Sequence, residues 1–89
     1  MPKPRTYKKP RPFVGLLKRR RGPRMARECL WSSTHPEDTS LMNRYNYVYG
    51  PFRTVRGAKW CQKFGPTEIA RTVTDMERAA LALEQLERS

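Results

Sequence analysis

The clearest pattern of apolar and polar positions lies in the last quarter of the chain. There, apolar residues recur three and four positions apart, the spacing of one face of an α-helix. The residues of this stripe are Ile69, Val73, Met76, Ala80 and Leu83. Residues 74–77 have the sequence TDME, which fits a capping box and marks the start of the strongest helical part. The pattern predicts an amphipathic helix within residues 67–89, with a stripe suited to packing on protein.

An alternating pattern precedes this helix. Tyr45, Tyr47 and Tyr49 occupy every second position, which is typical of a β-strand. Gly50-Pro51 interrupts the run, and residues 52–56 are expected to form a second extended piece, as in a hairpin. Residues 59–64 are expected to continue the extended structure as far as the next Gly-Pro pair.

The first third of the chain has weaker signals. Residues 1–12 alternate proline with lysine and arginine, which predicts an extended, polyproline-like chain. Residues 13–21 are expected to make one or two helical turns, and residues 24–32 a short helix with Cys29 and Leu30 on one side. Residues 32–40 are polar and predict a loop, although Pro36 followed by two acids also fits the first turn of a short helix. The predicted fold class is small α+β or irregular.

Charge divides the chain into two unlike regions. The 89 residues contain 19 lysines and arginines against 8 acids, a formal net charge of +11. Residues 1–27 contain no acid and hold the whole excess, whereas the remaining residues are balanced. The sequence therefore predicts an extended basic arm over 1–27, a small neutral body with a short helix and aromatic strands over 28–66, and the C-terminal helix over 67–89. So small a body is expected to be marginally stable alone.

An acid-free basic arm is suited to a polyanion, because each neutralised phosphate releases condensed counterions. We expect it to bind RNA rather than duplex DNA, since no helix-turn-helix, zinc finger or basic zipper is present. A solvated tail, a nuclear localisation signal and a contact with anionic lipid are the alternatives. The predicted RNA-binding residues are Lys3, Arg5, Lys8, Lys9, Arg11, Lys18, Arg19, Arg20, Arg21, Arg24 and Arg27.

Aromatic and basic residues also interleave between positions 44 and 60. Tyr45, Tyr47 and Trp60 are candidates for stacking on RNA bases. The competing interpretation is that alternating tyrosines pack a small core or a protein neighbour.

Catalytic and metal chemistry find no support in the sequence. Cys29 and Cys61 belong to no Cys-x-x-Cys pair, so two reduced cysteines are expected rather than a metal site, with a disulfide as the alternative. The lone histidine, His35, is expected at the surface. Without a nucleophile–base pair or a glycine-rich phosphate loop, we expect a binding protein that is not an enzyme and needs no cofactor.

The basic extension, compact neutral part and terminal helix together resemble the layout of small ribosomal proteins, especially accessory proteins of mitochondrial ribosomes. The resemblance is one of composition and organisation along the whole chain, without a specific family motif. It implies a structural subunit whose arm contacts rRNA while the body and terminal helix dock on neighbouring proteins. No small-molecule substrate is expected.

Two other functions remain open. One is an accessory subunit of a mitochondrial inner-membrane complex, such as the respiratory chain or ATP synthase, with the arm on lipid head groups or acidic protein. The other is a nucleic-acid packaging protein. The arginine-rich, acid-free start favours a mitochondrial matrix location over a cytoplasmic or nuclear one, and no apolar run is long enough to span a membrane.

Overall fold

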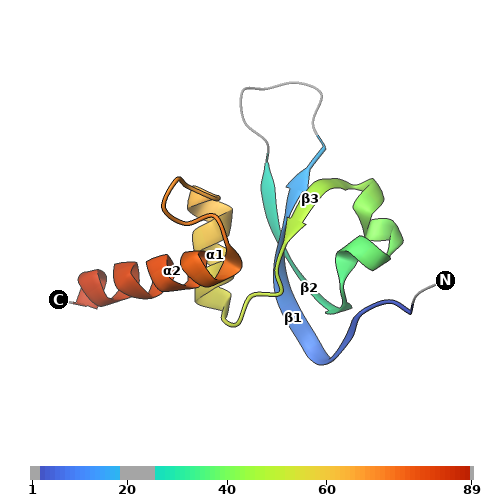
Figure 1. Ribbon diagram of the computed structural model, residues 1–89, viewed down its shortest axis with the longest axis horizontal. Coiled ribbons are helices and arrows are strands. Elements are labelled where there is room, and N and C mark those ends of the chain that lie inside the picture. The colour runs from blue at the N-terminus through green and yellow to red at the C-terminus, as the bar shows by residue number, and fades with distance from the viewer. Residues whose placement is uncertain (1–2, 19–25, 89) are drawn as a thin grey trace.

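The computed structural model describes residues 3–18 and 26–88. Three strands form an antiparallel sheet in the order β2-β1-β3, and two helices follow. Figure 1 shows α1 and α2 on one side of the sheet and two short 3₁₀ turns on the other. The elements are β1 (Thr6–Leu17), β2 (Arg27–Thr34), the 3₁₀ turns Pro36–Asp38 and Ser40–Asn43, β3 (Tyr45–Tyr49), α1 (Val55–Phe64) and α2 (Val73–Arg88). This arrangement confirms a small α+β fold.

The central strand is β1, so the expectation of a separate extended arm is wrong for residues 6–17. The apolar run that starts at Phe13 is covered on both faces, and Phe13 and Val14 are fully buried. A continuous apolar run is typical of a strand buried on both sides. Burial on this scale requires a partner on each face, which no local pattern in the sequence reveals.

The prolines are compatible with this strand because of where they lie. Pro10 falls in the irregular register between Thr6 and Arg11, where β1 departs from regular pairing with β2. Pro12 precedes Val14, which is the first residue of β1 that pairs with β3, so Pro12 lies outside that ladder. The Pro12 carbonyl accepts the N–H of Phe52 on that same side, so its missing donor costs no ladder bond.

Four helix or strand predictions are corrected. Residues 13–17 belong to β1 rather than to a helical turn, and β2 replaces the short helix expected over 24–32, of which 24 and 25 lie outside the described residues. Cys29 packs toward the helices and Leu30 toward the opposite face, a period of two. Residues 59–64, expected as strand, belong to α1, because Gly57, Ala58 and Cys61 form its buried face. The second extended piece expected over 52–56 is also wrong, since α1 already begins at Val55.

Both ends of α1 are capped. The Thr54 hydroxyl accepts the Gly57 N–H at 3.1 Å, and Gly65 ends the helix with a φ of 66°. Both features stabilise helix termini. The sequence pattern missed both caps, because Thr54 falls within the expected second extended piece and Gly65 was expected to end extended structure rather than a helix.

The predictions for β3 and for the C-terminal helix are confirmed, with one change in the cap. The hydroxyl of Thr72, rather than that of Thr74, accepts the N–H of Asp75. Glu77 does not close a capping box and instead reaches α1. Ile69 precedes the helix and is 90% exposed, so it does not belong to the buried stripe.

The sheet has a core on each face. Between sheet and helices lie Val14, Phe52, Ala58, Cys61, Ala70 and Met76. On the other face Phe13, Tyr45 and Val48 pack beneath the 3₁₀ turns. His35 is buried here, not at the surface as expected, because its ring packs edge-on against Phe13 at 5.1 Å and its Nδ1 accepts the Glu37 N–H.

Candidate nucleic-acid interface

The carboxylates of the body are largely occupied within the fold. Glu28 pairs with Arg44, Glu37 and Asp38 pair with Arg5, and Glu84 pairs with Arg56 and Arg88. A fifth, Glu77, accepts hydrogen bonds at the start of α1. These contacts use five of the eight acids, which weakens their ability to offset cations elsewhere on the surface.

Three arginines predicted to bind RNA make contacts inside the protein. Arg5 forms ion pairs with the 3₁₀ turn, at 2.9 Å to Asp38, and holds the pKa of that carboxyl down to about 2. Arg11 donates to the carbonyl of Phe52 and lies over the ring of Tyr7. Arg27 donates to two carbonyls at the C-terminus of α1, those of Gln62 and Lys63. These guanidinium groups therefore tie β1 and β2 to later parts of the chain.

The lysines of the same region are placed differently. Lys3, Lys8, Lys9 and Lys18 are all exposed, and none forms a salt bridge with another described residue. Lys8 and Lys9 lie between Thr6 and Arg11, where the pairing of β1 with β2 is irregular. Their amines are thus available to a partner with negative charge.

Lys18 lies where β1 gives way to the connection with β2. Its N–H donates to the Arg44 carbonyl, and the neighbouring Leu17 N–H donates to Ala26 at 2.9 Å. Arg19, Arg20, Arg21 and Arg24, the densest part of the predicted interface, lie outside the described residues. In sequence they fall between these two strands.

Only some of the predicted stacking residues are open to a base. Tyr45 is buried over Gly15, and its hydroxyl donates to Glu28 at 2.8 Å, so the prediction that it stacks on RNA is wrong. Burial and this hydrogen bond raise the pKa of Tyr45. Tyr47 is 49% exposed and lies 4.6 Å from Tyr49, centroid to centroid. The two rings line an open hollow of about 600 Å³ with Pro66, Thr67, Glu68 and Arg71.

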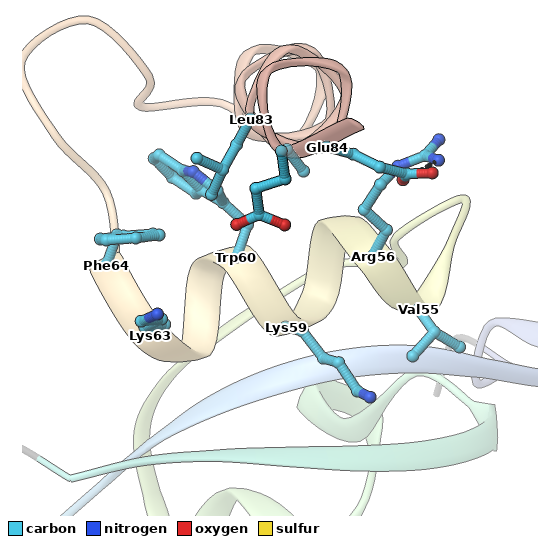
Figure 2. Close-up of a pocket in the computed structure, with 10 residues that line it drawn as sticks. Val55, Arg56, Lys59, Trp60, Lys63, Phe64, Leu83 and Glu84 are labelled. Carbon is cyan, nitrogen blue, oxygen red and sulfur yellow. Dashed lines mark hydrogen bonds and ion pairs between the residues drawn. The ribbon is translucent and has the colours of Figure 1, made fainter. Parts of the chain in front are cut away.

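The stripe predicted to dock on protein packs mainly on its own body. Met76 and Ala80 are buried, and Val73 packs against the same core, because α2 crosses α1. Leu83, which is half-buried, lines an opening between the two helices. Figure 2, which looks along α2, shows Leu83 beside Trp60 of α1.

This opening is a wedge of about 400 Å³ between the two helices. Its apolar lining comprises Val55, Trp60, Phe64, Ala80 and Leu83. Charged residues are divided between the two sides: Lys59 and Lys63 belong to α1, whereas Glu84 and Glu87 belong to α2. Figure 2 shows the Arg56–Glu84 ion pair at one end of the wedge, away from Phe64. The Trp60 ring packs against Phe64 at 5.3 Å, so its stacking surface is shared with the protein.

The two cysteines are free thiols in the core between the sheet and the helices, with Cys29 on β2 and Cys61 on α1. Cys29 donates to the side-chain oxygen of Gln62 at 3.1 Å, and burial raises its pKa. Burial raises the pKa of Cys61 to about 12. Within residues 3–18 and 26–88, no three metal-ligating side chains gather into a site, and no helix has the length and apolarity to cross a bilayer.

Comparison with known proteins adds no relative. No family model matches the chain, and searches of curated proteins and of solved structures give no match either.

Proposed function

We propose that this protein is a non-enzymatic RNA-binding subunit of a ribosome, with a mitochondrial ribosome favoured. The lysines of residues 3–18 and the arginines between β1 and β2 contact rRNA phosphates. The side of the protein that carries the two helices docks on a neighbouring protein. The observation that supports this most is that the arginines and lysines near the N-terminus are placed differently in the fold. Arg5, Arg11 and Arg27 hold the fold, whereas Lys3, Lys8, Lys9 and Lys18 are exposed and without a salt bridge to a described residue.

The protein-docking surface of this proposal is the wedge between α1 and α2. An apolar floor of Trp60, Phe64 and Leu83 beside Lys59 and Lys63 suits an apolar segment that carries carboxylates. The lysines on the α1 side supply charge complementarity, which guides association, and Glu84 on the α2 side is already paired with Arg56 and Arg88.

The experiment is RNA binding by the whole chain across a salt series. We expect affinity to fall steeply as salt rises, because counterion release supplies the free energy. Replacing Lys18 by Ala should lower the salt slope by about one. The matched control is Lys63→Ala on the helix side, which should leave the slope unchanged. A flat salt response of the wild-type protein would defeat the phosphate-contact model.

Replacing Arg19, Arg20 and Arg21 together by Glu tests the arginine-rich connection in an assembly experiment. The variant should fail to incorporate into ribosomes, whereas the control Arg78→Glu on α2 should incorporate normally. Unchanged incorporation of the triple variant would remove the anchoring role of these arginines.

The other two functions predict different behaviour. A subunit of an inner-membrane complex would sediment with membranes after ribonuclease treatment. A packaging protein would compact DNA, and the ordered sheet that contains residues 6–17 makes this third function less attractive.

A further inference from the structure

We propose that the hollow beside Tyr47 and Tyr49 binds one unpaired RNA base, stacked on the Tyr47 ring. This inference rests on the proposed RNA-binding function and adds to it the class of RNA recognised: a single-stranded segment or loop rather than a continuous duplex. The bases of a duplex are already stacked on each other, so only an unpaired base offers its face to a side chain.

The strand positions of the two tyrosines create the stacking surface. Tyr47 pairs with Leu16 and Tyr49 with Val14, two positions apart on each strand, so both tyrosines lie on the helix side of the sheet. The α1 helix covers Val14 and packs on Tyr49. Tyr47 lies nearer the start of β3, outside this contact, and remains 49% exposed. Because β3 is an edge strand, no further strand among the described residues covers the approach.

The opposite wall of the hollow is held in place by the segment between α1 and α2. Thr67 and Ala70 exchange two backbone hydrogen bonds, of 3.0 and 3.2 Å, and Ala70 is buried in the core. This small turn fixes the backbone that carries Glu68 and Arg71 beside the tyrosines. A site with one wall on a strand and the other on an anchored turn is preorganised, which lowers the entropic cost of binding.

The charges of the hollow suit a nucleotide. Arg71 is exposed and forms no salt bridge with a described residue, so its guanidinium is available for a phosphate. The Glu68 carboxylate accepts hydrogen bonds only, which fits the amino groups of adenine, cytosine and guanine. Lys18 lies just past Leu16, the strand partner of Tyr47, and leads toward the arginine-rich connection.

The wedge beside Trp60 is the less suitable aromatic site. Its aromatic surface is less open, because the Trp60 ring is half-buried and packs against Phe64, an apolar neighbour from the same helix. The Tyr47 ring is 49% exposed, and the hollow beside it carries an arginine without a described acidic partner.

The test measures binding of the whole chain to a fluorescent single-stranded RNA and to a blunt duplex of the same length, at one salt concentration. Tyr47→Ser should weaken single-strand binding by about 5-fold to 150-fold and leave duplex binding unchanged. Tyr47→Phe should bind like the wild type, since the ring is kept. Trp31→Ser, which removes an exposed aromatic of β2, the other edge strand, is the matched control and should change neither affinity.

The outcomes separate the two proposals. If the wild type shows salt-dependent RNA binding and Tyr47→Ser binds the single strand equally well, the base site is wrong and the phosphate interface stands. Equal losses on single strand and duplex would also reject the base site. If the wild type binds neither RNA, both proposals fall. Circular dichroism spectra matching the wild type will show that each variant is folded.

Discussion

The Glu77 carboxylate of α2 accepts hydrogen bonds from both the backbone N–H and the hydroxyl of Thr54, the residue that caps α1. It also accepts the N–H of Arg53 at 3.0 Å. A negative charge at a helix N-terminus is favourable, and these donors have no partner inside the helix. One side chain thus fixes the position of α2 on the start of α1.

Replacing Glu77 by Ala should lower the free energy of unfolding by about 2–3 kcal/mol, because hydrogen bonds to a charged group are lost and their donors are left without acceptors. Urea unfolding followed by circular dichroism measures the change. The control is Glu87→Ala, an exposed residue of the same helix, which should change stability by no more than about 0.5 kcal/mol. Equal stability of the two variants would contradict the role of Glu77.

Gly15→Ala should destabilise the sheet by about 1–3 kcal/mol. A Cβ at this position would lie 2.5 Å from a ring carbon of Tyr45, and the ring is confined by its hydrogen bond to Glu28. Thermal unfolding measures the loss. In a double-mutant cycle with Tyr45→Leu, the two effects should be less than additive, because the smaller side chain makes room for the methyl group. Strict additivity would mean that the ring is not what excludes the methyl group.

The Arg5–Asp38 pair should act on stability only above strongly acidic pH. Its hydrogen bonds lower the pKa of Asp38 from 3.8 to about 2. A lowered pKa in the folded state stabilises the protein above pH 3.8, and this contribution is lost as the pH falls through about 2. An NMR titration of the Asp38 carboxyl should show its midpoint move up toward 3.8 in Arg5→Ala. Lys3→Ala, the control, should leave the midpoint where it is in the wild type.

The two cysteines should react with iodoacetamide at different rates. The thiolate is the reactive form, and burial raises the pKa of Cys61 to about 12 while leaving its side chain inaccessible. At pH 8, mass spectrometry should show Cys29 modified first and Cys61 modified at a comparable rate only in denaturant. Faster modification of Cys61 in the folded protein would be incompatible with its place in the core.

The sequence predicted the elements whose pattern is local. The alternating tyrosines of β3 and the three-and-four spacing of α2 are visible within a few residues, and both were confirmed. In contrast, β1 and β2 are strands because Phe13, Val14 and Leu30 find apolar partners far along the chain. That information is not present in any short window.

The candidate site was predictable in part for the same reason. Charge counting grouped the lysines of residues 1–27 with Arg5, Arg11 and Arg27 and treated all these cations as equivalent. Their acceptors are Asp38, the Phe52 carbonyl and the end of α1, all distant in sequence. The hollow at Tyr47 also depends on Arg71, which lies 24 positions away in the sequence and reaches the strand only through the packing of the helices.

The burial of Met76 and Ala80 limits the design of docking experiments. Truncation after Thr74 would seem to test whether the C-terminal helix binds a neighbour. It would also remove two core side chains, and the protein would unfold. Substitutions in the wedge, such as Lys59→Glu with Lys63→Glu, change the docking surface without opening the core.

Within residues 3–18, the cations that form no salt bridge with a described residue are lysines, whereas the two arginines, Arg5 and Arg11, are bonded within the fold. Acylating reagents neutralise amines but do not touch guanidinium groups. Mild acetylation of the intact protein would therefore remove the charge of Lys3, Lys8, Lys9 and Lys18 while the contacts of Arg5 and Arg11 persist. Acetylation thus separates what the amines contribute to binding from what the guanidinium groups contribute, without disturbing the arginine contacts that hold β1 in the fold.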